Sequence, residues 1–146
     1  MNINTLTIKA QELLQEAMAL SREQGQQSLE PLHILAVAIK DDDSLASYLL
    51  GRVGANVATL RSELREAIAR LPRVEAAEEN IYFSRESSAV VQRATELTRT
   101  FGDRYASVEH LVAAIAKERS SARDILHRHG ISEEQLIAAI KEFRKG

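Results

Sequence analysis

Two stretches of the sequence are versions of one segment: "EPLHILAVAIK" at Glu30–Lys40 and "SVEHLVAAIAK" at Ser107–Lys117. Each has the apolar spacing of an amphipathic helix, and each carries a histidine at the same step, His33 in the first copy and His110 in the second. Two explanations compete. Either the two histidines belong to a site, or they mark the duplication of a packing unit.

The similarity extends well beyond this segment. Aligning residues 6–50 with residues 83–127 gives ten identical pairs, several of them small or turn-forming residues. Beyond them the register slips by one residue, so that Leu60 is matched by Leu136. Reuse of one packing solution leaves such residues at matching helix ends. We therefore interpret the duplication as structural in the first place, and a structural role near a helix start as the favoured explanation of His33 and His110.

Helix-period apolar residues run through nearly the whole chain, and strand-like alternation is scarce. Capping and breaking residues divide the first half into four helices, with starts and stops at Thr7, Gly25, Pro31, Ser44, Gly54, Asn56 and Pro72. The pattern restarts at Ser84 and ends in a helix with a capping box at Ser132. We expect an all-α, eight-helix single domain of two pseudo-twofold-related four-helix repeats, with repeat one at 5–71, a connector at 72–82 and repeat two at 83–146.

Charge and composition exclude several classes of partner. The chain of 146 residues has 19 basic and 21 acidic residues, and its net charge of −2 gives no broad positive field for nucleic acid or an anionic membrane. It has no cysteine, which excludes disulfides and thiolate chemistry. The start "MNINTLTIKAQELL" lacks the features of a signal peptide, and no segment is apolar enough to span a membrane. We expect a soluble, cytoplasmic protein.

The residues that carry chemistry do not form a recognisable catalytic or metal site. Neither repeated histidine has a second ligand three or four residues along, and the pair in "HRH" at His127–His129 has the wrong spacing for chelation. The run "DDD" at Asp41–Asp43 lacks the alternating ligands of a calcium loop, and there is no glycine-rich phosphate loop. We predict no catalytic residues, metal or cofactor, and elimination leaves an interaction module.

Six stretches, in order, resemble the N-terminal domain of the ClpB-type AAA+ disaggregases, within the Clp N-domain family shared with ClpA and ClpC. They cover almost the whole chain and read "LTIKAQELLQEA", "LEPLHIL", "LPRVE", "FSRESSAVVQRA", "GDRYASVEHLVAAI" and "AAIKEFRKG". Each is weak alone, but six in order together with the internal repeat are specific. The "EPLH" and "LPRVE" stretches are more similar to ClpB than to ClpC.

This resemblance implies a non-catalytic domain tethered to a hexameric ATPase ring, which helps to capture unfolded or aggregated polypeptides through an apolar groove. The isolated domain would be a monomer and its parent protein a homohexamer, and this chain alone would not hydrolyse ATP. The alternative is an adaptor-docking domain of the ClpA or ClpC kind, whose ligand is a folded adaptor protein.

The resemblance also implies site residues. It places three polar residues near the rim of the groove, namely Thr7, Asp103 and Glu109. Each has a structural explanation beside the functional one, since Thr7 can cap a helix, Asp103 can shape a turn and Glu109 can favour the positive end of a helix dipole.

For the lining of the groove we expect four aliphatic residues, although helix-period aliphatics are more often ordinary core: Leu13, Val90, Val91 and Leu97. His110 stands where several relatives carry an aliphatic residue, so the groove is expected to be more polar in this chain.

Overall fold

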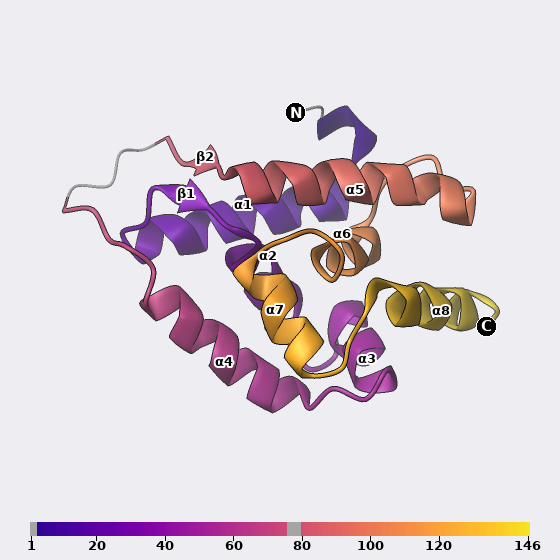
Figure 1. The fold of residues 1–146 in the computed structure, drawn as a ribbon. Coiled ribbons are helices and arrows are strands. Elements are labelled where there is room, and N and C mark those ends of the chain that lie inside the picture. Colours follow the sequence, from indigo (N-terminus) through magenta and orange to yellow (C-terminus); the bar gives the residue numbers. More distant parts are fainter. Residues whose placement is uncertain (1–2, 76–79) are drawn as a thin grey trace.

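The computed structural model describes residues 3–75 and 80–146, and these residues form the expected all-α architecture (Figure 1). The first half contains a 3-10 turn and four helices: η1 (Ile3–Thr5), α1 (Ile8–Glu23), α2 (Pro31–Ala38), α3 (Leu45–Arg52) and α4 (Val57–Ala69). The second half contains four more: α5 (Arg85–Phe101), α6 (Val108–Ile115), α7 (Ser121–Arg128) and α8 (Glu133–Arg144). Two very short strands are present, β1 (Ser28–Leu29) and β2 (Tyr82–Phe83). Part of the predicted connector 72–82 lies outside the described residues.

The predicted caps explain where the helices begin. The side chains of Thr7, Ser44 and Asn56 each accept a hydrogen bond from the backbone N–H three residues along, and so start α1, α3 and α4. Ser84 and Ser132 do the same for α5 and α8. These bonds satisfy donors that have no partner inside the helix, which is why short polar residues recur at these positions.

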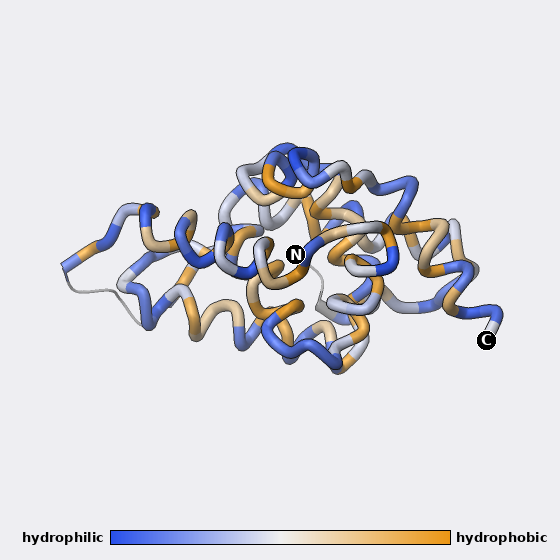
Figure 2. The backbone as a smooth tube through the Cα atoms, turned by 90° about the horizontal axis from the view of Figure 1, so that it is seen from below, coloured by the Kyte–Doolittle hydropathy of each residue, from blue (hydrophilic) through white to orange (hydrophobic). Residues whose placement is uncertain are grey.

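The helices form three layers in Figure 1. The central helices α2 and α6 lie between α1 and α5 on one side and α3, α4, α7 and α8 on the other. In α6 every residue from His110 to Ile115 is buried, and in α2 every residue from Pro31 to Leu35. Hydrophobic and hydrophilic residues alternate along the outer helices (Figure 2), as expected of amphipathic helices around a shared core.

The two halves are joined by a contact that is made twice. Leu29 of β1 pairs in parallel with Phe83 of β2, and Leu6 pairs in parallel with Ala106. In the sequence repeat Leu29 is equivalent to Ala106, and Phe83 is equivalent to Leu6. The second pairing is therefore the first with the halves exchanged, which is what a pseudo-twofold relation requires.

No helix among residues 3–75 and 80–146 is at once long enough and apolar enough to cross a membrane.

Candidate functional site

The four aliphatic residues predicted to line a groove lie in the hydrophobic core. Their exposed fractions are 7% for Leu13 on α1, and 0%, 2% and 1% for Val90, Val91 and Leu97 on α5. The reason is that α1 packs on α2 and α5 packs on α6, so the apolar faces of the outer helices are covered by the central pair. The prediction that these residues line an open groove is therefore wrong for this structure.

Two of the three predicted rim residues, Asp103 and Glu109, do come together, around a residue that the sequence interpretation missed. Arg144, the last residue of α8, donates from Nη1 to both carboxylate oxygens of Asp103, at 3.0 and 2.8 Å, and from Nη2 to Glu109 Oε2 at 3.3 Å. Its guanidinium carbon also lies 4.9 Å from the centre of the Phe101 ring. Asp103 and Glu109 thus share the single positive charge of a partner some forty residues along the chain.

His110 is buried beneath this cluster. Its Nδ1 accepts the backbone N–H of Ser107 at 2.8 Å, which leaves the proton on Nε2, and Nε2 lies 2.8 Å from Asp103 Oδ2 in a poorly aligned contact. Burial lowers the pKa of His110 by more than the nearby carboxylates raise it. The edge of its ring meets Phe101, with ring centres 5.2 Å apart. His110 is therefore a neutral packing residue here rather than a group that faces solvent.

His33 makes the same arrangement in the first half. Its Nδ1 accepts the backbone N–H of Glu30 at 2.9 Å, and its Nε2 lies 2.7 Å from Gln26 Oε1. Gln26 in turn donates to the carbonyl of Ile68 at 2.7 Å, which ties the start of α2 to the end of α4. Burial lowers the pKa of His33 to about 4.

The two histidine networks match position by position. Gln26 is equivalent to Asp103 in the sequence repeat, and Ile68 is equivalent to Arg144. Both histidines thus close a capping box at the start of a central helix. This confirms the structural explanation of the repeated histidine. Among the described residues no group of three or more histidine, aspartate or glutamate side chains is arranged to hold a metal ion.

Thr7 lies next to the polar cluster but uses its hydroxyl elsewhere. Its Oγ1 accepts the N–H of Ala10 at 3.1 Å, which is the capping role, while its own N–H donates to the carbonyl of Ala106 at 2.9 Å. That second bond holds the start of α1 against the loop between α5 and α6. The capping explanation of Thr7 is therefore confirmed, and a functional role remains a prediction.

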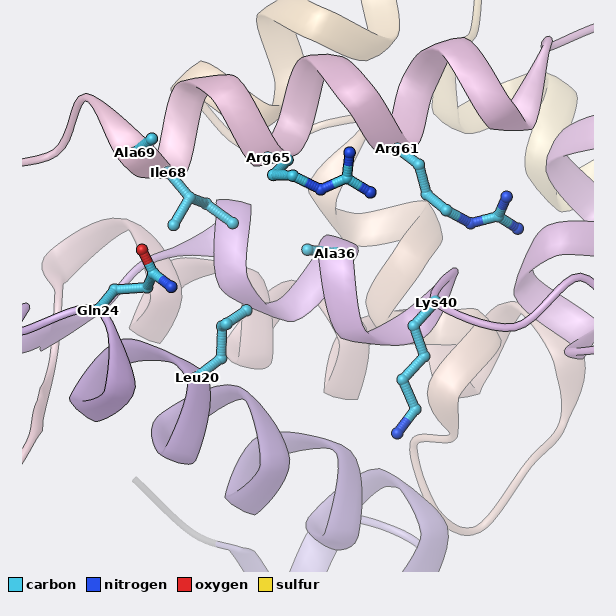
Figure 3. A pocket seen from close by; sticks show the side chains of 8 residues that line it. All are labelled: Leu20, Gln24, Ala36, Lys40, Arg61, Arg65, Ile68 and Ala69. Atoms are coloured by element: carbon cyan, nitrogen blue, oxygen red, sulfur yellow. The ribbon is translucent and has the colours of Figure 1, made fainter.

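An open cleft lies elsewhere, between α1, α2 and α4 (Figure 3). It has a volume of about 280 Å³, and its apolar surface comes from Leu20 on α1, Ala36 on α2, and Ile68 with Ala69 on α4. Leu20 and Ala36 are only partly buried, so the apolar surface is accessible. A second hollow continues the cleft along α1 and α2 past Val37.

Among the residues that the structure describes, three cations line this cleft and no carboxylate does. Two of them are already paired: Lys40 lies 2.7 Å from Glu16, and Arg61 lies 2.6 Å from Asp42. The third, Arg65, makes no ion pair or hydrogen bond with any residue that the structure describes, and in Figure 3 its guanidinium extends along the cleft toward Arg61. The periodicity of apolar residues does not predict this cleft, because it places Leu20 on the same face as the core residues of α1.

Comparison with known proteins decides the family. The sequence profile of the Clp repeat N-terminal domain matches residues 5–129. The chain belongs to the Clp N-domain family. A ClpB chaperone from Porphyromonas gingivalis is 39% identical over all 146 residues, which make up 17% of that relative's length.

Solved structures of other Clp N-domains share the fold. The Hsp104 N-terminal domain from Candida albicans superposes with a TM-score of 0.82 at 22% identity, covering 95% of this chain and 91% of its own. A ClpV N-domain solved in complex with a VipB peptide has a TM-score of 0.71 at 20% identity, covering 92% of this chain and 83% of its own. This chain is thus a Clp N-domain that is similar in sequence to part of ClpB chaperones and in fold to the Hsp104 N-terminal domain.

Proposed function

We propose that this Clp N-domain captures unfolded or aggregated polypeptides for a ClpB-type disaggregase, and that the cleft between α1, α2 and α4 is the surface that does so. The observation that carries the proposal is the accessible apolar surface of Leu20 and Ala36 in an open cleft. Unfolded chains expose aliphatic and aromatic side chains, and such a surface removes them from water without requiring a particular sequence.

The size of the cleft sets the expected strength of binding. A volume of about 280 Å³ accommodates one or two side chains rather than a folded element. Each buried apolar side chain contributes roughly 1.5–3 kcal/mol before ordering costs, which leaves a micromolar or weaker affinity. Weak sites of this kind act together when several copies surround one client, because avidity builds while each contact still releases. A hexameric parent protein would supply those copies.

Adaptor docking is the second candidate, and one observation favours it. A ClpV N-domain has been solved in complex with a VipB peptide, which is consistent with recognition of one defined segment. Under this alternative the purified chain binds one partner segment at a fixed stoichiometry. Under the first candidate it binds many unfolded chains and ignores folded ones.

Chemical-shift mapping of the ¹⁵N-labelled chain tests the proposal. With carbamidomethylated lactalbumin, which is permanently unfolded, we expect shifts to concentrate at Leu20, Ala36 and Ile68, and native lactalbumin should give none. Leu20→Asp should remove binding, whereas Ile8→Asp is a matched control because Ile8 is 76% exposed on the same helix, outside the cleft. Circular dichroism checks that both variants fold. Equal binding by Leu20→Asp and the parent chain would reject the cleft as the capture surface.

A further inference from the structure

The internal repeat provides a counterpart of the open cleft in the second half of the molecule. Leu20 and Ala36 are equivalent to Leu97 and Ala113, which are the same residue types. Yet Leu97 is 1% exposed and Ala113 is 0% exposed, whereas Leu20 and Ala36 are only partly buried. The corresponding space in the second half is therefore filled.

The equivalent wall in the second half carries a partly buried aromatic residue, Phe101. It is equivalent to Gln24, which lines the open cleft in the first half. The Phe101 ring lies below the guanidinium of Arg144, at 4.9 Å, and within 6.0 Å of Lys141 Nζ. Both cations come from α8, the helix equivalent to α4. We call the Phe101 ring the aromatic plug of the second half; the cations Lys141 and Arg144 of the neighbouring helix lie beside it.

The plug is also linked to carboxylates. The same Arg144 that stacks on Phe101 donates hydrogen bonds to Asp103 and Glu109. An arginine can do both at once, because its planar face stacks on a ring while its edges donate to carboxylate oxygens. Aromatic ring, arginine and carboxylate therefore form one compact unit, all within the chain.

The first half has the walls and one cation, but none of the three parts of this unit at its equivalent position, since Ile68 stands where Arg144 does. Arg65 is equivalent to Lys141, lies on the wall of the cleft and has no ion pair among the described residues. At the position of the ring stands Gln24, and no carboxylate among residues 3–75 and 80–146 lines this cleft. Glu16 and Glu23 line the hollow that continues it; Glu16 is paired with Lys40, and Asp42 is paired with Arg61.

We propose that the cleft of the first half binds an aromatic side chain that has an acidic residue beside it in an extended polypeptide. The ligand's ring takes the place that Phe101 occupies in the second half, with Arg65 over its face, and the adjacent carboxylate pairs with the edge of the Arg65 guanidinium. Segments in which the ring is flanked by lysine or arginine are disfavoured, because Arg65 gives the cleft wall a positive charge, whereas Lys40 and Arg61 are already paired with Glu16 and Asp42. This inference rests on the proposed function, and it names the class of segment that the capture surface prefers.

Three capped peptides test it in titrations of the ¹⁵N-labelled chain: acetyl-GSFESG-amide, its Phe-to-Leu form and its Glu-to-Lys form. The first should shift the signals of Gln24, Ala36 and Ile68, and we expect the other two to bind at least about threefold more weakly. Equal affinity for all three peptides would overturn the inference. So would shifts that concentrate at Asp103 and Glu109 instead of the cleft.

Two variants separate the parts of the interaction. Gln24→Phe copies the plug of the second half into the first and should abolish binding of acetyl-GSFESG-amide without unfolding the chain. Arg65→Gln should lower the affinity several-fold and remove the preference for glutamate over lysine, whereas Arg52→Gln, an equal change of charge at an exposed position of α3, should leave both unchanged. Retention of the preference in Arg65→Gln would contradict the role of Arg65.

The lactalbumin and peptide titrations distinguish a failure of the capture surface from a failure of the aromatic–acidic preference. If carbamidomethylated lactalbumin shifts the cleft residues but the three peptides bind alike, the capture surface stands and the aromatic–acidic preference is wrong. If neither probe shifts the cleft residues, both the capture surface and the preference are wrong.

Discussion

At the scale of single residues, the repeated histidine shows how one position can be retained for packing while its surroundings diverge. His33 and His110 accept the same backbone bond at the start of a central helix. Their outer nitrogens face different partners, an amide in one half and a carboxylate in the other. Gln26 donates a hydrogen bond to the backbone carbonyl of Ile68 on α4, whereas Asp103 accepts a hydrogen bond from Arg144 on α8. The two halves thus share the bond between the histidine and the helix start, but they differ in the side chains that surround the outer nitrogen.

Arg144 allows a test of this view at His110. Its positive charge lowers the pKa of His110, so Arg144→Ala should raise that pKa, even though burial continues to lower it. Titration of the His110 imidazole by NMR measures the change. Arg52→Ala on α3 serves as the control and should leave the pKa where it was. A pKa that stays unchanged in Arg144→Ala would mean that the guanidinium does not act on the imidazole.

Thr7 offers a second test at this scale, because its hydroxyl caps α1. Thr7→Ala should lower the free energy of unfolding by about 1 kcal/mol, the usual cost of a lost N-cap. Ser132→Ala, which removes the cap of α8, should cost a similar amount. Urea denaturation measures both. If Thr7 acts only as a cap, binding of unfolded protein per folded molecule stays the same in Thr7→Ala. A loss of binding beyond that of Ser132→Ala would show a further role.

At the scale of elements, the caps and the apolar periodicity predict the helices well, because both depend on neighbours within one turn. They do not predict which face of a helix is left uncovered. Leu97 and Leu20 stand at equivalent positions, yet Leu97 is 1% exposed and Leu20 is only partly buried, a difference that arises from tertiary packing and not from the local pattern. Likewise, Arg144 and Asp103 are too far apart in sequence for any local pattern to pair them.

The burial of Leu97 leads to a prediction about α5. Leu97→Asp places an uncompensated carboxylate in a site that is 1% exposed, so it should destabilise the fold by at least about 3 kcal/mol. The loss should appear in urea denaturation as a lowered midpoint or as an unfolded chain. Ile8→Asp, at the exposed first position of α1, should be neutral or slightly stabilising because a negative charge suits a helix start. A fully stable Leu97→Asp variant would contradict the placement of α5.

At the scale of the whole molecule, the two buried histidines make stability depend on pH. The pKa of His33 is about 4 in the folded chain and about 6.5 in the unfolded chain, so the unfolded state binds more protons between these values. The free energy of unfolding therefore falls as the pH is lowered through this window and levels off above it. The shift corresponds to roughly 3 kcal/mol, and the lowered pKa of His110 acts in the same direction.

Urea denaturation at pH 7 and pH 4.5 measures this dependence. His33→Gln keeps a hydrogen-bonding side chain but removes the titration, so its stability should fall less on acidification than that of the parent chain. His127→Gln, a change at an exposed position, should keep the full dependence. An equal loss of stability in the parent chain and in His33→Gln would mean that other groups cause it.

The exchanged pairings, Leu29 with Phe83 and Leu6 with Ala106, have a consequence for how the molecule came to be one chain. In each pairing, a short extended segment of one half pairs with a segment of the other half. Neither half therefore contains all the hydrogen-bond partners of its own backbone. Two separate copies of an ancestral single unit could make the same exchange between molecules. On this view the present chain arose when two such copies were fused into one polypeptide. After the fusion the clefts of the two halves could diverge, one becoming filled by side chains of the chain itself and the other staying open.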